Sequence, residues 1–475
     1  MTPEEFRRAG HQLVDWIAEY VANVESRPVT SDVVPGDVLA ALPEAPPDTV
    51  DDFASVLADV DSTIVPALTH WQHPSFFGYF PANSSYSSIL AELLSAGLGV
   101  NGMSWVTSPA CTELEIRVVD WLAALLGLPD RFLSTSDGGG VIQGTASEAT
   151  LVAILSARWR ATSGRVNNDG DTTKLVAYIT SQAHSSLEKG LRIAGIGTAQ
   201  TRIVAHDETF AMRPDALAEA VAADRAAGLV PFFVCSSRGT TSSMAFDPTP
   251  AIAEIARANG MWLHVDAAMS GIAALAPEYR WVNDGLESAD SYCTNPHKWM
   301  GINFDCDVYW TADRSALLGA LSILPEYLRS AAAAAGAAVD LRDWQIPLGR
   351  RFRSLKLWFG LRLDGIDTFQ ARIRDHVTIT AELAAWIADD PRFEIVAPHP
   401  LNLVCLRVAD RAGGDEATER LIEDANATRR VLFTRTVLDD RPVLRFSVGG
   451  AQTQRRHVRA AWELLQSLVA PVPAG

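Results

Sequence analysis

The sequence predicts an α/β protein with a mostly parallel central sheet that is covered by helices. Apolar runs typical of β-strands occur six times between residues 174 and 310, and Ala/Leu-rich helical segments alternate with them. The runs are apolar throughout, which is typical of strands buried on both faces. They are KLVAYIT (174–180), TRIVAHD (201–207), LVPFFVCS (229–236), MWLHVDAA (261–268), SADSYCTN (288–295) and FDCDVYW (304–310). Before the fourth run, DPTPAIAEIARANG predicts a helix that ends on Gly260.

The spacing of apolar residues and prolines predicts three regions. Residues 1–85 form an N-terminal helical segment, 86–355 the large α/β domain and 356–475 a small α+β domain. The first helix has one apolar stripe, which includes Phe6, Val14 and Val21. Such helices cannot form a core alone, so we expect residues 1–85 to pack on something else, such as a partner subunit.

Composition excludes several classes of protein. The net charge of −17, with 40 basic and 57 acidic residues, is unlike that of a nucleic-acid binder or a protein attracted to anionic membranes. The five scattered cysteines form no zinc-binding pattern and no disulfide framework, so no metal is expected. Charges interrupt the N-terminus where a signal peptide needs its apolar core, and no apolar run is long enough to span a bilayer. These features predict a soluble cytoplasmic protein.

Chemically useful side chains follow the predicted strands. His184 comes after the first run, Thr241 after the third, Asp266 ends the core of the fourth, and Lys298 follows the fifth. In open α/β sheets, ligands bind beyond the carboxyl ends of the strands. We therefore expect these groups to converge on one edge of the sheet.

A helix start adds an anion site. In GGGVIQGTASEAT, residues Thr145 to Glu148 fit a capping box, with Ala146 and Ser147 in the first turn of a long helix. Free amides and the helix dipole at such a start attract a phosphate. No Gly-Lys-Ser/Thr follows the glycines, and GxGxxG is absent, so neither a P-loop nor a dinucleotide fingerprint is indicated.

One cofactor needs all of these groups, namely pyridoxal 5'-phosphate. Its ring nitrogen needs a carboxylate such as Asp266 to stay protonated, and its aldehyde needs an amine such as Lys298. His184 is placed to stack on the ring, and the helix start at Ala146 is placed to bind the phosphate.

The motifs NPHKW, HVDAA, SQAHSS, QGTASEAT and WQIPLGRRFRSLK resemble those of the group II pyridoxal-phosphate decarboxylases, in the aromatic-L-amino-acid decarboxylase branch. The resemblance extends from FRRAG through HPSFFGYFP and SPACTELE to the C-terminal region. It implies a fold-type-I pyridoxal enzyme that decarboxylates aromatic L-amino acids such as tryptophan, DOPA, tyrosine or phenylalanine to arylalkylamines. It also implies an obligate homodimer with sites at the subunit interface.

The resemblance also implies a role for each matching residue. Lys298 is the Schiff-base lysine, Asp266 the partner of the pyridinium and His184 the stacking residue. The remaining implied roles are ring packing by Ala268, support of His184 by Thr241, phosphate binding by Ala146, Ser147, Asn295 and His297, protonation of the α-carbon by Tyr327, and a substrate pocket formed by Trp71, Tyr79, Phe80 and Met103.

Rival functions remain open at this point. Acetaldehyde synthases of the family replace the loop tyrosine by phenylalanine, whereas this chain has Tyr327. Histidine decarboxylases tend to carry serine at the position of Gly349. A pyridoxal aminotransferase uses the same lysine and aspartate, and a cofactor-binding protein without turnover is the non-enzyme rival.

Overall fold

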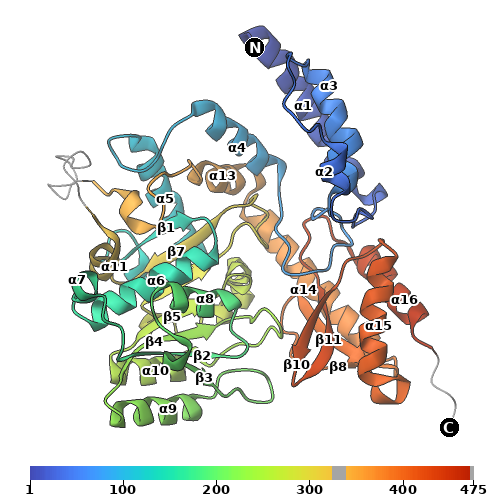
Figure 1. Cartoon of the computed structure of the whole chain (residues 1–475). Coiled ribbons are helices and arrows are strands. Elements are labelled where there is room, and N and C mark those ends of the chain that lie inside the picture. The colour runs from blue at the N-terminus through green and yellow to red at the C-terminus, as the bar shows by residue number, and fades with distance from the viewer. Residues whose placement is uncertain (324–337, 471–475) are drawn as a thin grey trace. The chain divides into compact units, whose positions relative to one another are not determined.

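The structure is a computed structural model that describes residues 1–323 and 338–470. The chain forms two compact units (Figure 1). The larger contains residues 82–380 and 397–403, and the smaller contains residues 1–81, 381–396 and 404–475. The smaller unit thus joins the N-terminal helices to the C-terminal region, while the predicted division at residues 85 and 355 stays a prediction. Within the described residues, no helix is long and apolar enough to cross a membrane.

The large unit is built on a seven-stranded sheet with the order β1-β7-β6-β5-β4-β2-β3. The strands are β1 (Gly139–Gln143), β2 (Leu175–Thr180), β3 (Thr201–Val204), β4 (Val230–Ser237), β5 (Trp262–Asp266), β6 (Ser291–Thr294) and β7 (Asp307–Thr311). Strands β2 to β6 pair in parallel, and β7 runs antiparallel to both of its neighbours. The sheet confirms the predicted α/β class, and all six predicted runs contain a strand.

Strand β1 was missed because its glycines are typical of a loop. The sheet needs a glycine there: a Cβ on Gly140 would lie 2.4 Å from Val119 Cγ1 and 2.6 Å from Trp310 Cδ1. Helix α5 (Pro109–Leu126), which carries Val119, therefore packs directly on the β1 backbone.

Helices cover both faces of this sheet, as the sequence predicts. On one face, α6 packs on the strands that carry Val141, Cys293 and Tyr309, and α8 packs against α6 in the same core cluster. On the other face, α5 lies over Gly140, and the Tyr178 hydroxyl of β2 donates to Asp224 of α9 at 2.8 Å. The helices of this unit are α4 (Tyr86–Leu98), α5 (Pro109–Leu126), α6 (Ala146–Ala161), α7 (Val166–Asp169), α8 (Ser185–Ile193), α9 (Pro214–Ala226), α10 (Thr249–Asn259), α11 (Arg314–Leu321) and α13 (Ser354–Phe359). Helix α10 ends on Gly260 in the left-handed conformation, which confirms that prediction.

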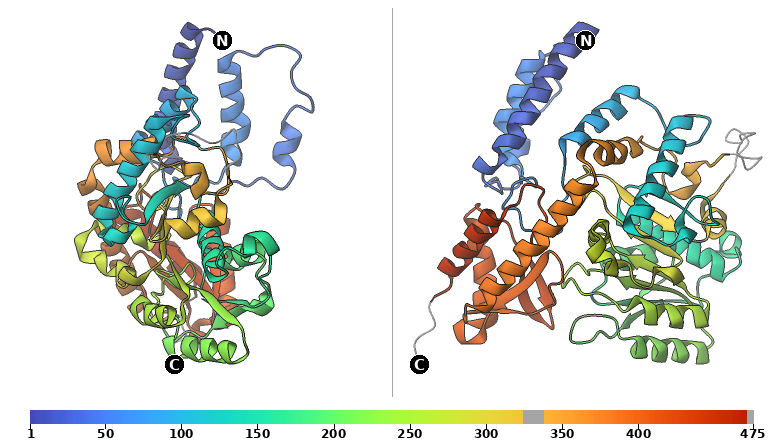
Figure 2. Two further views of the ribbon diagram at one scale, coloured as in Figure 1. Left: turned by 90° about the vertical axis from the view of Figure 1, so that its left-hand side faces the viewer. Right: turned by 180° about the vertical axis from the view of Figure 1, so that it is seen from behind.

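The small unit includes the blue N-terminal helices and the red C-terminal helices of Figure 2, and it contains a four-stranded sheet with the order β10-β11-β9-β8. Its strands are β8 (Phe393–Ile395), β9 (Leu403–Val408), β10 (Thr434–Leu438) and β11 (Arg441–Ser447), and its helices are α1 (Pro3–Asn23), α2 (Asp37–Ala41), α3 (Phe53–Asp59), α15 (Gly414–Ala427) and α16 (Arg455–Leu468). The boundary between the units falls within α14 (Ile366–Ala388). Backbone hydrogen bonds tie the N-terminal segment to this sheet region, from Val29 to Arg429 at 2.8 Å and from Phe77 to Leu432 at 2.9 Å.

Candidate active site

The carboxyl edge of the large sheet gathers the predicted reactive groups. Strand β5 ends on Asp266, and Lys298 lies four residues beyond the end of β6, the neighbouring parallel strand. His184 begins helix α8 just after β2. These groups act on one another electrostatically: burial and Lys298 lower the pKa of His184, and Asp266 opposes this shift. The structure therefore brings His184, Asp266 and Lys298 together at one edge, while the expected placement of Thr241 beside them stays a prediction.

The chain has only four lysines, so few side-chain amines are candidates for binding a cofactor aldehyde. Lys174 and Lys189 are exposed. Lys356 is buried on α13, where its ammonium lies 3.2 Å from a carboxylate oxygen of Glu92. Lys298 is half-buried at the sheet edge and is the lysine that lies beside Asp266 and His184.

The backbone at Lys298 is held firmly. The side-chain amide of Asn83 donates to the Lys298 carbonyl at 2.8 Å, and the Asn83 backbone donates to the His297 carbonyl at 2.9 Å. The Lys298 amide donates to the Asn295 carbonyl at 3.0 Å. Asn83 was missed from the sequence because nothing in its local pattern reveals a contact 215 residues away.

Asp266 is almost fully buried and is oriented by its own strand end. Its Oδ1 accepts a hydrogen bond from the Ala268 amide at 3.0 Å. The Ala268 carbonyl in turn accepts from the Asn295 amide at 3.0 Å, so that the two strand ends are locked together. Two residues earlier on β5, burial lowers the pKa of His264 to about 4, and this ring is therefore a neutral neighbour of the carboxylate.

His184 is a neutral, oriented ring. Its Nδ1 accepts from the Ser186 amide at 3.2 Å and lies 2.8 Å from the Ser186 hydroxyl. Because Nδ1 is an acceptor and the pKa is lowered, the proton of the neutral ring lies on Nε2. Within the described residues, no hydrogen bond joins Thr241 to His184, so the supporting role of Thr241 stays a prediction.

The start of α6 corrects one prediction. Thr145 is the N-cap, but its side chain makes no capping hydrogen bond. The carboxylate of Glu148 instead accepts from the Gly144 amide at 3.1 Å and from the Ile346 amide at 3.1 Å. The capping box is wrong because Glu148 serves two other backbone groups. Ala146 and Ser147 occupy the first turn, where backbone amides have no partner within the helix.

One further group suits an anion at this helix start. His297 is 3% exposed, and burial together with Lys298 lowers its pKa to about 3. Its Nδ1 accepts from the Cys306 amide at 3.0 Å, which leaves Nε2–H as a donor. Asn295 is also buried, and its Oδ1 has no hydrogen-bond partner among the described residues. The helix-start amides and Nε2–H of a neutral histidine are donors that fit a phosphate, whereas the unsatisfied Oδ1 of Asn295 is an acceptor and does not add to them.

The expected substrate-pocket residues do not all belong to one unit. Trp71, Tyr79 and Phe80 lie in the small unit, where the rings of Trp71 and Tyr79 stack with centroids 5.5 Å apart. Met103 lies in the large unit, and its carbonyl accepts from the Arg342 amide at 2.9 Å. Whether they line one pocket stays a prediction. Tyr327 lies outside the described residues.

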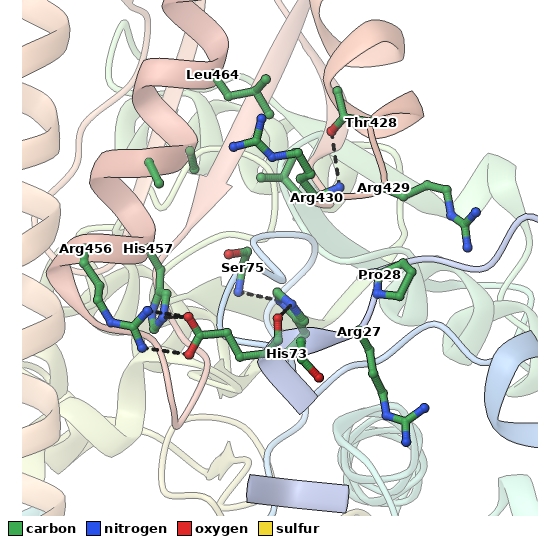
Figure 3. Close-up of a pocket in the computed structure, with 15 residues that line it drawn as sticks. Arg27, Pro28, His73, Ser75, Thr428, Arg429, Arg430, Arg456, His457 and Leu464 are labelled. Carbon is green, nitrogen blue, oxygen red and sulfur yellow. Dashed lines mark hydrogen bonds and ion pairs between the residues drawn. The ribbon is translucent and has the colours of Figure 1, made fainter. Parts of the chain in front are cut away.

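A hollow of about 550 Å³, whose lining includes several charged side chains, lies within the small unit (Figure 3). Its charged groups largely satisfy one another. The carboxylate of Glu25 is paired with Arg456 and with His457 at 3.1 Å, and Arg456 helps to lower the pKa of Glu25 to about 2. No lysine lines this hollow, so it cannot hold an aldehyde cofactor covalently.

An amine, a strand-end carboxylate, a neutral ring and a phosphate cradle on one sheet edge define a pyridoxal-phosphate enzyme of fold type I. Comparisons with known proteins narrow this class. Residues 35–409 match the pyridoxal-dependent decarboxylase conserved domain. The chain therefore belongs to the pyridoxal-dependent decarboxylase family, and its cofactor is pyridoxal 5'-phosphate.

Curated relatives and solved structures match this chain over almost its whole length. The chain is 46% identical to tryptophan decarboxylase 2 of Oryza sativa subsp. japonica, over 98% of this chain and 95% of that protein. It is also 46% identical to phenylacetaldehyde synthase of Arabidopsis thaliana, over 98% and 96% of the two chains. The crystal structure of Oryza sativa TDC with PLP and tryptamine superposes with a TM-score of 0.95 at 38% identity, covering 98% of both chains.

Proposed function

We propose that this protein decarboxylates aromatic L-amino acids, releasing carbon dioxide and the corresponding arylalkylamine. The observation that carries the proposal is the placement of Lys298, Asp266 and His184 at one sheet edge, within a chain that is similar over its full length to tryptophan decarboxylases.

When bound, pyridoxal phosphate supplies an electron sink for the electron pair left by the departing carboxylate. The residues of the chain do the rest. The carboxylate of Asp266 holds a proton on the ring nitrogen, and the planar ring of His184 stacks on the cofactor face. The amine of Lys298 would hold the cofactor covalently through its aldehyde.

The start of α6 and two side chains near it would bind the phosphate. The amides of Ala146 and Ser147 point out of the first helical turn, and Nε2–H of His297 and the amide of Asn295 add donors. The proton delivered to the α-carbon is assigned to the hydroxyl of Tyr327, as the resemblance implies.

A panel of amino acids tests the proposed activity. Purified holoenzyme is incubated with tryptophan, 5-hydroxytryptophan, DOPA, tyrosine, phenylalanine and histidine, and carbon dioxide, amine, aldehyde and hydrogen peroxide are measured. We expect amine and carbon dioxide from at least one aromatic substrate. Aldehyde with hydrogen peroxide and no amine would instead identify an acetaldehyde synthase, histamine alone a histidine decarboxylase, and amino transfer to an added oxo acid an aminotransferase.

Tyr327 gives this experiment a matched variant. Tyr327→Phe keeps the aromatic ring and removes the hydroxyl. We expect it to lower amine formation at least tenfold and to raise the share of aldehyde. Unchanged amine formation would remove Tyr327 from the proposed mechanism.

We also propose that the protein acts as a homodimer in the cytoplasm. Helix α4 presents an apolar stripe at Leu90, Leu93, Leu94 and Leu98, each between 43% and 52% exposed. Phe6 of α1 is 62% exposed as well. A second copy of the chain is the occupant that suits these apolar faces, because residues of one face can pair with their own copies across a twofold axis.

Sedimentation tests the dimer. Leu94→Glu introduces a charge into the stripe of α4 and should yield monomers. Ile193→Glu changes a separate exposed residue, 62% exposed at the end of α8, and should stay dimeric. A Leu94→Glu protein that sediments as a dimer would exclude the α4 stripe from the interface.

A further inference from the structure

Asp307 lies at the same sheet edge as the proposed cofactor-binding groups. It is the first residue of β7, and its cross-strand partner on β1 is Gln143, the last residue of that strand. On the other side, β7 pairs with β6 through Val308 and Thr294. Because β7 runs antiparallel to both neighbours, its first residue lies where β1 and β6 end.

Asp307 also projects from the face on which Asp266 lies. Asp266 pairs with Cys293, and Cys293 pairs with Tyr309. Paired residues share a face, and residues two apart along a strand do too. Asp307 is therefore on the face that α6 covers, with Gln143 beside it.

The carboxyl group of Asp307 accepts no hydrogen bond from the residues that the structure describes. It is fully buried, and neither oxygen has a hydrogen-bond partner among the described residues. The same holds for Oε1 of the buried Gln143 opposite. Nε2 of Gln143 donates to the Trp344 carbonyl at 2.8 Å, which fixes the orientation of its amide. Two side chains with buried, unsatisfied acceptor oxygens are thus cross-strand partners, an arrangement that costs free energy unless one of them supplies a proton.

The surroundings of Asp307 favour its neutral form. Burial raises the pKa of Asp307 well above its ordinary value, the charges of Asp266 and Glu148 raise it further, and Lys298 opposes them. Asp305, two residues earlier, differs: its carboxylate accepts two hydrogen bonds from one arginine, each at 3.1 Å, and its pKa is lowered.

We propose that Asp307 keeps its proton in the cofactor-loaded enzyme and donates it to Oε1 of Gln143, as a positioning residue for the phosphate-binding helix start. Gln143 immediately precedes Gly144 and the N-cap of α6. Protonated Asp307 stabilises this turn by a hydrogen bond and adds no negative charge near the bound phosphate. The inference rests on the cofactor site proposed above and not on which amino acid is the substrate.

Infrared difference spectroscopy tests the proton directly. At pH 7.5, wild-type holoenzyme should show the carbonyl-stretch band of a protonated carboxyl group, and Asp307→Asn should lose it. Asp305→Asn is the matched control: it removes an ionised carboxylate two residues away and should keep the band. If Asp307→Asn keeps every protonated-carboxyl band of the wild type, the proposal is wrong, whatever the enzyme's activity.

Cofactor affinity tests the donor role. The dissociation constant for pyridoxal phosphate is measured by titration of apoenzyme. Asp307→Asn retains a side-chain donor for Gln143 and should bind within about threefold of wild type, whereas Asp307→Leu removes the donor and should bind at least about tenfold more weakly. Equal affinities of the Asn and Leu variants would overturn the donor role, and the infrared result decides independently should Asp307→Leu fail to fold.

Discussion

The buried ion pair between Arg350 and Glu115 allows a sharp test of how the large unit holds its site. The two side chains are 1% and 3% exposed. Glu115 of α5 also accepts from the Ile142 amide at 2.8 Å, and Arg350 donates to the Ile142 carbonyl at 3.2 Å. The pair therefore ties the segment around residue 350 to β1, next to Gln143.

Replacing Glu115 by Gln keeps the size of the side chain and leaves the Arg350 charge buried without its counter-ion. Breaking a buried pair in this way costs about 3–5 kcal/mol. The exposed pair between Glu278 and Arg374, with side chains 44% and 46% exposed, is the matched control. Its variant Glu278→Gln should lose no more than about 1 kcal/mol, because water screens the charges.

Urea unfolding of both holoenzyme variants, at one protein and one cofactor concentration, gives the two free-energy changes. We expect Glu115→Gln to lose at least about 2 kcal/mol more than Glu278→Gln. Losses equal to within about 1 kcal/mol would show that burial does not make the Arg350 pair the stronger constraint.

Two further predictions concern the site. Asp266→Asn keeps an oxygen for the Ala268 amide but removes the charge that holds a proton on the cofactor ring. We expect kcat to fall at least about 100-fold while the cofactor stays bound. A fall in kcat of less than about tenfold would contradict this role of Asp266. The pKa of His297, about 3 when folded, lies below the ordinary value of 6.5, so the unfolded chain binds the extra proton first and stability falls as the pH drops from about 6.5 towards 3. Through this one group, each pH unit in that window lowers the free energy of unfolding by roughly 1.4 kcal/mol. In His297→Gln, the free energy of unfolding measured with urea should therefore depend less on pH between pH 6.5 and 5. A pH dependence equal to that of the wild type would contradict this prediction.

The sequence predicted the parts of the fold that local pattern determines. The apolar runs before Asp266 and Lys298 are buried strands, because a parallel sheet covered on both faces requires apolar residues throughout. Strand β1 was not predicted from the sequence. Its Gly140 is required by the close approach of a helix that a local sequence pattern does not reveal. The capping box at Thr145 failed because Glu148 is drawn to the Ile346 amide, 198 residues away.

The candidate site shows the same division between local and long-range information. Strand ends and a helix start located Lys298, Asp266 and Ala146, since position along an element is readable from one chain. Asn83 and Asp307 were missed because their importance arises from strand register and from contacts across the fold. One local signal was present for Asp307: an aspartate inside the predicted apolar run FDCDVYW is unexpected in a buried strand.

Trapping the cofactor on its lysine tests the assignment of Lys298 as the residue that binds the aldehyde. Borohydride reduction of the holoenzyme converts the link between the cofactor aldehyde and an amine into a stable bond, and mass spectrometry of the digested chain locates it among the four lysines. We expect a phosphopyridoxyl group on Lys298, with none in Lys298→Ala. A label on Lys174, Lys189 or Lys356, or no label on any lysine of the loaded enzyme, would contradict it.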